Sequence, residues 1–540
     1  MRCSILKTIM PYFLLTCLSL VFFLPGLLSL PVVDRDEAHF AQATRQMMET
    51  GHYFQVRFQQ ITRFQKPPGI NWLQAASVQL TGNNGLIWPY RLPSLLGALG
   101  SVLLTFFFAR RFLPQRAALL GSAFLAASML LVVEAHLSVT DAALLCTMVM
   151  MQGALWVIYQ TDRIETPPWG WAALFWIAMS LGVVLKGITP LVGGLTVVTL
   201  SLVDRRFVRG LRVYRGLLVF AGVSVVWLMK LNTAEHSNYL LQMLRHDLLP
   251  KLQGGHESHG KPPLFHLLIL PMTFWPASLF LWQGGVYGWK HRQEQTVRFL
   301  LSWIIPTWIF FEIMPTKLPQ YVLPTFPALA LLCALAVVTA RGRMPSRGVR
   351  VLQVLWGVMS LIFAFSLVGL SYFLMKQVLS VSVMLVVGIG VTALVGVWFA
   401  YKGLLQRASI AVLCAAVLTY PLVFETLLPA LKPLWLPEKI AQFIHVRETL
   451  NNQPLLVFGY GEPSLVFYLQ TNQVVWMDNK AMLLKRLQAQ SDSVLLIDHG
   501  LLEPLSQEVQ GLKKIASFSG YNYNASRWIT LDLVQRQEGR

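Results

Sequence analysis

The chain has 540 residues, of which 55% are hydrophobic and only 13% are charged. Soluble proteins carry about twice that charged fraction, so the composition excludes an ordinary soluble enzyme and indicates a polytopic membrane protein. The formal net charge is +19, yet the basic residues stand at the ends of apolar runs and do not form one patch. We therefore expect a lipid bilayer as a partner and no nucleic acid.

About thirteen apolar runs come near the ~20 residues that cross a bilayer as a helix. They cover residues 8–30, 89–109, 117–134, 141–159, 169–185, 188–203, 214–231, 264–282, 298–314, 320–340, 351–373, 379–400 and 408–428. The first run follows Arg2 and Lys7, which is also typical of a signal peptide. Its length and the lack of a small-residue cleavage site favour an uncleaved span. The sequence thus predicts an all-α membrane bundle over residues 1–429.

Basic residues are concentrated on alternate loops between these runs. The basic loops are 110–116, the loop around Arg163, 204–215, 290–298, 341–350 and 401–407. The short loops between them hold little besides Lys186, Lys317 and Lys376. Because Lys and Arg are retained in the cytoplasm, this pattern predicts a bacterial inner-membrane protein with its N-terminus inside and its C-terminus on the periplasmic side.

Residues 430–540 differ from the rest of the chain. Strand-like runs (455–460, 474–477, 494–498 and 528–533) alternate there with helix-like runs (438–450, 479–490 and 502–510). This alternation predicts a small α/β domain on the outer face of the membrane. The pair Gly459 and Gly461 alone is too weak a signal for a nucleotide site.

Two long polar segments, residues 31–88 and 232–263, separate apolar runs on the predicted outer side. Long loops usually carry function. The first contains acids at its start, an amphipathic segment over 38–48 that we expect to lie in the membrane interface, and a Lys-Pro-Pro turn. A substrate with a polar head and a lipid tail would suit such a loop.

Acidic residues gather on this same side. Asp34 and Glu37 have the spacing of a helix-capping box, but a cap does not require a third acid, so we single out Asp36 and Glu37 as functional candidates. Asp141 opens an apolar run and is either a functional acid or a simple N-cap. The same two interpretations hold for Glu134 near a helix end.

Basic residues gather there as well. Lys66 precedes the Pro-Pro pair and is either functional or a solvated turn residue. Lys186 interrupts a long apolar stretch, where an ionised group is costly unless it reaches the headgroups. Lys317 and Tyr321 stand where the apolar run 298–314 gives way to the run 320–340. The histidines of this face are expected to be interfacial polar residues and not metal ligands: His136, His256 and His259.

These segments together resemble a known family. The matching stretches are DRDEAHFAQATRQMMETGHYF, RFQKPPGINWLQAASVQLTG, SVTDAALL, LKGITPLV and MPTKLPQYVLPTFPALALL. In order and spacing they are similar to the aminoarabinose transferases and protein mannosyltransferases, polytopic glycosyltransferases of the GT-C fold. The resemblance covers roughly residues 8–340, and the tail from about residue 430 adds nothing to it.

The resemblance implies a chemistry. Such an enzyme takes a sugar from a polyprenyl phosphate and passes it to a glycolipid or glycan acceptor on the outer side. By that resemblance Asp36 is the candidate catalytic acid and Asp141 a further site acid, and Glu37, singled out above beside Asp36, completes the candidate catalytic set. The candidate donor-phosphate ligands are Lys66, Lys186, Lys317 and Tyr321. A hydroxyl acceptor needs a base, whereas a phosphate acceptor is already ionised.

Several alternatives stay open in the sequence. The acceptor is either lipid A or another envelope glycolipid, which the resemblance favours, or a Ser/Thr hydroxyl of a protein. Gln65 replaces a Glu that serves a metal in some relatives, so the sequence requires no cofactor, and a divalent metal ion remains an alternative. A transporter of lipid-linked sugars and a non-catalytic assembly subunit are the rival classes.

Overall fold

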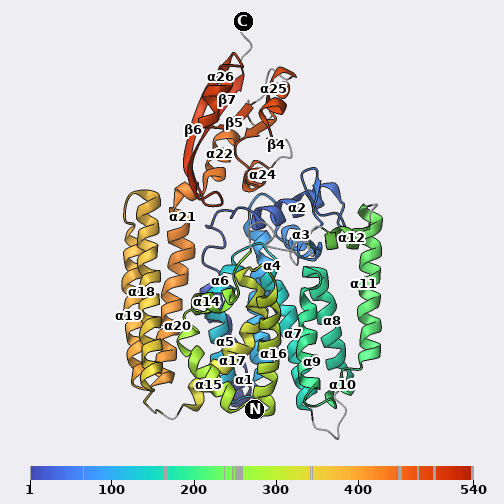
Figure 1. Ribbon diagram of the computed structural model, residues 1–540, viewed down its shortest axis with the longest axis vertical. Coiled ribbons are helices and arrows are strands. Elements are labelled where there is room, and N and C mark those ends of the chain that lie inside the picture. Colours follow the sequence, from blue (N-terminus) through green and yellow to red (C-terminus); the bar gives the residue numbers. More distant parts are fainter. Residues whose placement is uncertain are drawn as a thin grey trace.

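The protein consists of a bundle of long helices with a small sheet-containing domain stacked on one end (Figure 1). The computed structural model describes residues 2–64, 66–161, 168–235, 238–245, 249, 260–340, 342, 344–447, 450, 453–470, 474–489 and 494–536. The N-terminus lies at the end of the bundle opposite the small domain, and the C-terminus lies at the tip of that domain (Figure 1).

The bundle contains long helices and short connecting ones. The long helices are α1 (Arg2–Phe23), α4 (Trp88–Ala109), α5 (Gln115–Ala127), α7 (Asp141–Gln160), α8 (Trp169–Lys186), α11 (Val213–Glu235), α16 (Gln295–Ile313), α17 (Phe326–Thr339), α18 (Arg347–Met375), α19 (Ser380–Tyr401) and α20 (Leu405–Pro421). The shorter ones are α6 (Met129–Ala135), η1 (Thr189–Val192), α9 (Gly193–Ser201), α10 (Phe207–Gly210), α12 (Tyr239–Met243), α14 (Phe265–Thr273), η4 (Ala277–Phe280), α15 (Leu281–Lys290), η5 (Pro319–Thr325), η6 (Leu422–Leu427), α21 (Leu428–Ala430) and η7 (Lys432–Leu434).

The predicted membrane bundle is confirmed, but the predicted number of spans is not. Within the described part of the chain, nine helices are long and apolar enough to cross a membrane, and eleven if two bent pairs each count as one span. The bent pairs are α5 with α6, at 60°, and α14 with η4 and α15, at 115°. Two shorter apolar helices, Ile9–Phe23 and Thr189–Ser201, fall on the two remaining predicted runs. Thirteen spans therefore stays a prediction.

The bend between α5 and α6 is built into the packing. Ser128 has an extended backbone, with φ −65° and ψ 126°, which interrupts the helical hydrogen bonds. The freed groups find other partners, because Tyr420 donates its hydroxyl to the Ala127 carbonyl at 2.7 Å and the Met129 N–H donates to the Trp275 carbonyl at 3.0 Å. Buried backbone groups inside an apolar bundle require such partners. The bend redirects α6 so that Glu134 comes near the ends of α7 and α8.

The first long loop forms two helices and a hairpin between the bundle and the small domain (Figure 1). The elements are α2 (Asp36–Thr50), β1 (Arg57–Phe58), β2 (Ile61–Thr62) and α3 (Gly69–Thr81). The capping box considered above is wrong for Asp34. The N-cap of α2 is Arg35, which has a positive φ of 67° and makes no side-chain cap, while Asp34 contacts the small domain.

The C-terminal part is the α/β domain that the sequence predicts. Its elements are α22 (Leu436–His445), β3 (Leu455–Phe458), α24 (Ser464–Leu469), β4 (Val474–Met477), α25 (Lys480–Ala489), β5 (Val494–Asp498), α26 (His499–Ser506), β6 (Leu512–Asn522) and β7 (Arg527–Arg536). The strand order is β4-β3-β5-β7-β6, with β3 parallel to β4 and β5 and the other pairs antiparallel. Apolar clusters cover both faces of the sheet, one around Ile440 and Leu496 and the other around Leu483 and Leu495.

Candidate active site

Glu37 holds the start of the first loop in place. Its side chain is 1% exposed, and Arg91 of α4 donates to both its oxygens at 2.8 Å. The Val33 and Ser138 N–H groups also donate to it, at 2.8 and 2.9 Å. Four hydrogen bonds occupy the carboxylate and neutralise its charge. This geometry favours a structural role for Glu37 over a catalytic one.

Asp36, the next candidate, is left accessible by this network. It is the first residue of α2 and is exposed, while its neighbours Glu37 and Ala38 are buried. Its carboxylate is close enough to interact electrostatically with Glu134 of α6. The rigid Glu37–Arg91 pair therefore presents Asp36 at the edge of a charged cluster.

The centre of that cluster is an ion pair between Asp141 and Lys186. Asp141 begins α7 and Lys186 ends α8, and both side chains are only 8% exposed. The Lys186 ammonium also lies 5.7 Å from the centre of the Tyr321 ring, and Thr140 donates its hydroxyl to the second oxygen of Asp141 at 3.3 Å. Three of the predicted site residues, Asp141, Lys186 and Tyr321, are thus brought together.

Glu134 joins this cluster, although the sequence only marked it as an acid near a helix end. It is 5% exposed and interacts electrostatically with Asp141, Lys186 and Asp36. One of its oxygens, Oε2, is buried without a hydrogen-bond partner in the described part of the chain. The available signal was the cost of an acid inside an otherwise apolar run.

The turn that carries Lys66 is pressed against α8 near Lys186. A Cβ atom at Gly69 would collide with the carbonyl oxygen of Val184, so only glycine permits this approach. The Lys66 side chain is half-buried, and its carbonyl accepts a hydrogen bond from the Tyr239 hydroxyl at 3.0 Å. The close approach brings the predicted phosphate-binding turn to the end of α8.

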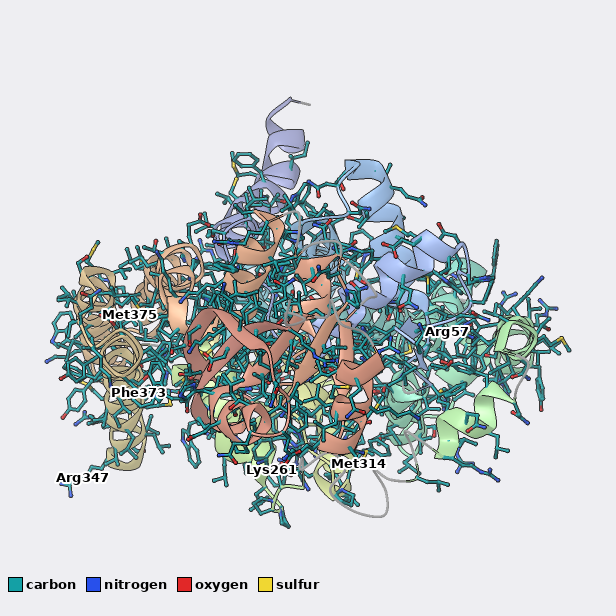
Figure 2. All side chains as sticks on the ribbon, turned by 90° about the horizontal axis from the view of Figure 1, so that it is seen from above. Arg57, Lys261, Met314, Arg347, Phe373 and Met375 are labelled. Atoms are coloured by element: carbon teal, nitrogen blue, oxygen red, sulfur yellow. The ribbon has the colours of Figure 1, made fainter. Side chains whose placement is uncertain are left out.

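Lys317 is held by backbone carbonyls. It is 4% exposed, and its ammonium donates to Met314 O at 2.7 Å and to Lys261 O at 3.2 Å. Met314 and Lys261 lie near one another when the molecule is viewed from the small domain (Figure 2). The segment continues into η5, which contacts α6 and α7. Lys317 therefore secures the turn that presents Tyr321 to Lys186.

An apolar groove lies directly beside these charges. Its volume is about 700 Å³ and it runs between α3, α4, α7 and α8. The lining residues include Gly69, Leu73, Leu96, Cys146, Leu181 and Leu185. Leu73, Leu96 and Leu181 are 45%, 60% and 49% exposed, so the groove faces outward, where lipid surrounds a membrane protein. Gly69 and Leu185 connect it to the turn of Lys66 and to Lys186.

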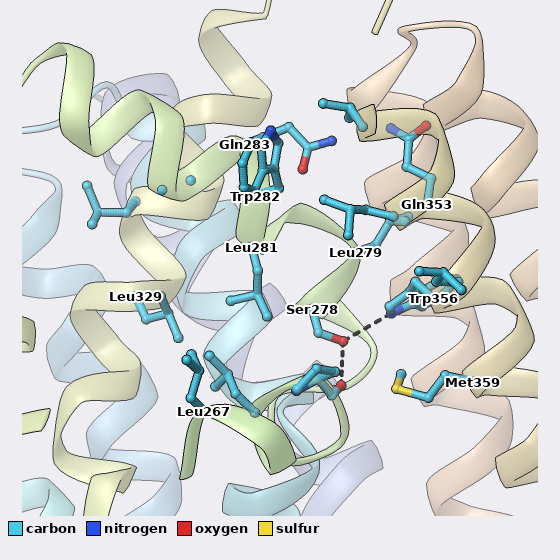
Figure 3. Close-up of a pocket in the computed structure, with 18 of the residues that line it drawn as sticks. Leu267, Ser278, Leu279, Leu281, Trp282, Gln283, Leu329, Gln353, Trp356 and Met359 are labelled. Atoms are coloured by element: carbon cyan, nitrogen blue, oxygen red, sulfur yellow. Dashed lines mark hydrogen bonds between the residues drawn. The ribbon is translucent and has the colours of Figure 1, made fainter. Parts of the chain in front are cut away.

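A second cavity, of about 610 Å³, lies between α14, η4, α15, α16 and α17 on one side and α18 on the other. In Figure 3 it is lined by apolar side chains, with Gln283 and Gln353 at one end. Ser278 links two other lining residues, because its hydroxyl accepts from Trp356 Nε1 at 3.0 Å and donates to the Pro271 carbonyl at 2.6 Å. Neither cavity is lined by a charged residue, but none of the residues lining this one adjoins a candidate site residue in the sequence, whereas Leu185 of the first groove adjoins Lys186.

The small domain is fastened to the start of the first loop. The Ser464 N–H donates to Asp34 Oδ1 at 3.0 Å, and the Asp34 N–H donates to the Tyr523 hydroxyl at 2.6 Å. Burial, followed by the negative charge of Glu462, raises the pKa of Asp34 to about 7. Arg45 of α2 adds a hydrogen bond to the Phe467 carbonyl at 2.7 Å. The domain thus contacts the chain two residues before Asp36.

Comparison with known proteins gives the fold and shows which families the chain is similar to. The family described as dolichyl-phosphate-mannose-protein mannosyltransferase matches residues 65–229. Over 97% of both chains, the structure superposes on the crystal structure of ArnT from Cupriavidus metallidurans in the apo state, with a TM-score of 0.74 and 20% identity. The ArnT structure bound to undecaprenyl phosphate gives 0.74 at 19% identity, over 98% of both chains. The chain therefore has the fold of ArnT, and part of it is similar to the mannosyltransferase family.

Relatives of this protein are similar over much of its length. An undecaprenyl phosphate-alpha-4-amino-4-deoxy-L-arabinose arabinosyl transferase of Pseudomonas fluorescens is 28% identical over 441 residues, which is 79% of this chain and 78% of that enzyme. The corresponding transferase of Pseudomonas aeruginosa is 27% identical over 307 residues, covering 56% of this chain and 55% of that enzyme. The second match thus spans about half of the relative's length.

The described residues offer little to a metal ion. In the part of the chain that the structure describes, no group of three or more His, Cys, Asp and Glu side chains is placed to hold one. His136 contacts the Val132 and Pro25 carbonyls at 2.7 Å and stacks on Phe424 at 3.8 Å, so both its nitrogens are occupied. Gln65, His256 and His259 lie outside the described residues.

Proposed function

We propose that this protein is a membrane glycosyltransferase that moves a sugar from a polyprenyl phosphate to a lipid-borne acceptor on the outer side of the inner membrane. The observation that carries the proposal is the arrangement of two features: an acid–lysine cluster of Asp36, Glu134, Asp141 and Lys186, and an apolar groove of about 700 Å³ beside it. A polar head joined to a long hydrocarbon tail fits both at once.

The groove receives the tail of the donor. A polyprenyl chain is entirely apolar, and the groove lining is almost wholly aliphatic and open to the bilayer. Transfer of apolar surface is not the driving force here, because lipid tails are as apolar as Leu. The groove instead supplies close packing and fixes where the head of the molecule stands.

The lysines receive the phosphate. Lys66 precedes Gly69 by three residues and Lys186 follows Leu185, and Gly69 and Leu185 both line the groove. Charged hydrogen bonds to phosphate strengthen as negative charge develops on the departing group. Tyr321, beside Lys186, places a hydroxyl-bearing ring at the same point, and Lys317 braces its turn.

Asp36 is the base in this proposal. An acceptor hydroxyl attacks the anomeric carbon of the sugar while the bond from that carbon to the phosphate oxygen breaks. The bonding electrons leave with the polyprenyl phosphate, and the hydroxyl proton passes to the Asp36 carboxylate. Asp141 orients Lys186. A phosphate acceptor is already ionised at neutral pH, and Asp36 would then position it and take up no proton.

The acceptor that we propose is lipid A or another envelope glycolipid, since the nearer resemblance is to the arabinosyl transferases of Pseudomonas. A serine or threonine hydroxyl of a protein is the second candidate. It is favoured by the match of residues 65–229 to the protein mannosyltransferase family. In both cases the outer placement of the site rests on the Lys/Arg asymmetry of the loops.

A transporter of lipid-linked sugars is the rival class. Transporters place charged groups along a path near the middle of the membrane. Here the cluster stands at the ends of α7 and α8, at the end of the bundle that carries the first loop and the small domain (Figure 1). That position favours chemistry at one face over passage through the bilayer.

A transfer assay with purified protein tests the proposal. The protein is reconstituted in lipid discs with a polyprenyl-phosphate-linked pentose and an extract of envelope glycolipids. We expect sugar in the glycolipid fraction and release of an equal amount of polyprenyl phosphate. Movement of intact donor across proteoliposomes without any transfer, under conditions where the protein is folded, would overturn the proposal in favour of a transporter.

A further inference from the structure

The second apolar cavity is separate from the groove beside Lys186. It lies between α14, η4, α15, α16 and α17 on one side and α18 on the other, and the two share no lining residue. Several of its lining side chains are exposed on the apolar surface of the bundle: Leu267, Trp282, Leu352 and Leu355. The cavity is therefore open to the lipid that surrounds a membrane bundle.

Two glutamines stand at one end of this cavity (Figure 3). Gln353 of α18 is only 2% exposed, and its Nε2 atom donates to the Ala400 carbonyl at 3.3 Å. The Oε1 atoms of Gln353 and Gln283 are both buried without a hydrogen-bond partner in the described part of the chain. Because nearly all buried polar atoms in proteins are hydrogen-bonded, a ligand with an apolar body and a hydrogen-bond donor at its head suits this cavity.

The glutamine end of the cavity points toward basic residues. Along α18, Gln353 follows Arg347, the first residue of that helix. Along α15, Gln283 precedes Lys290, the last residue of that helix. At 1.5 Å per residue, each glutamine stands about 10 Å along its helix from that basic residue.

These helix ends belong to the predicted cytoplasmic side of the protein. Figure 1 shows α15 near the end of the bundle where the N-terminus lies, and the loops 290–298 and 341–350 are two of the basic loops. Arg292 lies over the Trp289 ring at 4.5 Å and Arg350 over the Tyr401 ring at 4.4 Å. Aromatic and basic side chains together are typical of the interface between a bilayer and water.

We propose that the cavity binds an anionic phospholipid of the inner leaflet whose headgroup carries hydroxyls, as in phosphatidylglycerol. One acyl chain fills the apolar body of the cavity, and a headgroup hydroxyl donates to the unpartnered glutamine oxygens. The basic residues at the ends of α15 and α18 attract the phosphate. The inference does not depend on the proposed sugar transfer, because the polar end of this cavity points away from the end of the bundle that carries Asp141 and Lys186.

The headgroup is chosen by charge and by hydrogen bonding together. Phosphatidylethanolamine supplies an ammonium donor for the glutamine oxygens, but it has no net charge and gains little from the basic helix ends. Phosphatidylglycerol supplies both a net negative charge and hydroxyl donors. A preference between these two lipids therefore measures the contribution of the basic residues.

Lipid retention by the purified wild-type protein tests the proposal. The full chain is reconstituted in lipid discs that contain phosphatidylethanolamine and phosphatidylglycerol in equal amounts and is then transferred to a mild detergent. Native mass spectrometry identifies the lipids that remain bound. We expect phosphatidylglycerol to be retained about 10-fold over phosphatidylethanolamine, the lower end of the range for one charged hydrogen bond. Equal retention, a preference for phosphatidylethanolamine, or no retained lipid would overturn the proposal, and this comparison needs no variant to fold.

A matched pair of glycines separates this cavity from the general lipid surface. Gly285 lines the cavity, whereas Gly369 of α18 does not, and a Cβ atom at either position would meet nothing within 4 Å. Gly285→Phe should fill the cavity and reduce retained phosphatidylglycerol about 10-fold, while Gly369→Phe should retain it as the wild type does. Undiminished retention by a folded Gly285→Phe protein would refute this site.

The variant Gln283→Leu tests the glutamine end. It keeps the approximate size of the side chain and removes the amide, so an acyl chain still fits the cavity. The preference for phosphatidylglycerol over phosphatidylethanolamine should change while the total amount of retained lipid stays the same. An unchanged preference would show that the headgroup does not contact Gln283 and would overturn the assignment of the polar end.

Discussion

The contact between Asp34 and the small domain should make docking of that domain depend on pH. Asp34 is 9% exposed, and its carboxylate accepts from the Ser464 N–H. Burial and the charge of Glu462 raise its pKa to about 7 in the docked form, from the ordinary aspartate value of 3.8. The docked form therefore binds more protons than the undocked form between about pH 4 and pH 7.

The sign and size of the effect follow from linkage. Because the pKa is raised by docking, the free energy of docking is most favourable below pH 4 and weakens as pH rises toward 7. A difference of about three pKa units, at 1.36 kcal/mol each, gives a loss of about 4 kcal/mol across that window. Above pH 7 the carboxylate is ionised in both forms and the dependence on Asp34 ends.

Hydrogen exchange in α24 measures this docking. Exchange of its amides, corrected for the intrinsic rate, should become faster between pH 5 and pH 8 in the wild-type protein. Asp34→Asn keeps the acceptor for the Ser464 N–H and removes the titration, so α24 should stay protected at pH 8. Asp498→Asn, which removes the partner of Arg527 elsewhere in the domain, is the control and should behave as the wild type. A wild-type domain equally protected at both pH values would refute the reasoning.

Three further predictions follow from the site. Lys66→Ala should raise the KM for donor by about 10- to 100-fold, with Lys66→Arg retaining part of the binding, and unchanged donor kinetics at normal expression would reduce Lys66 to a turn residue. Glu37→Gln should lower stability by about 3–5 kcal/mol, because it leaves the Arg91 charge buried without its partner. A thermal shift assay would detect the loss of stability. A Glu37→Gln protein that keeps its full stability but loses turnover would instead assign a catalytic role to Glu37. A membrane-impermeant thiol reagent should label Lys480→Cys from outside and spare Lys402→Cys, and the reverse pattern would invert the topology.

The sequence was most informative where a single physical constraint acts over a long segment. Apolar runs must hide their backbone in helices, so each predicted run corresponds to a helix or to a bent helix pair. The sequence could not show that the run over 117–134 bends at Ser128, because the partners that permit the bend, Tyr420 and Trp275, come from distant helices.

Local patterns were least informative where tertiary contacts decide the structure. Strand β6 was missed because its residues are mostly half-exposed, so Lys513 and Lys514 obscure the alternation of a buried strand. Asp34 resembled a helix cap, yet its partner is Ser464, 430 residues away.

In the candidate site, too, the sequence predicted some features and tertiary contacts decided others. Asp141, Lys186 and Tyr321 were singled out in the sequence, and the structure brings them together. Asp36 and Glu37 are adjacent carboxylates, and the sequence does not distinguish their roles. In the structure Arg91 binds Glu37, while Asp36 is exposed. The sequence left Glu134 either a functional acid or a simple cap, and the structure brings it into electrostatic reach of Asp141 and Lys186, with one oxygen unpartnered among the described residues.

The central claim is that an acid at the start of α2 serves sugar transfer from a polyprenyl phosphate. The most direct test is the single-turnover rate of transfer to a hydroxyl acceptor by purified wild-type protein and by Asp36→Asn, with donor saturating. The account predicts a loss of about 10²–10⁴ in rate, with donor binding and thermal stability unchanged. Near-normal turnover of Asp36→Asn on every acceptor would contradict it and pass the role of base to Asp141.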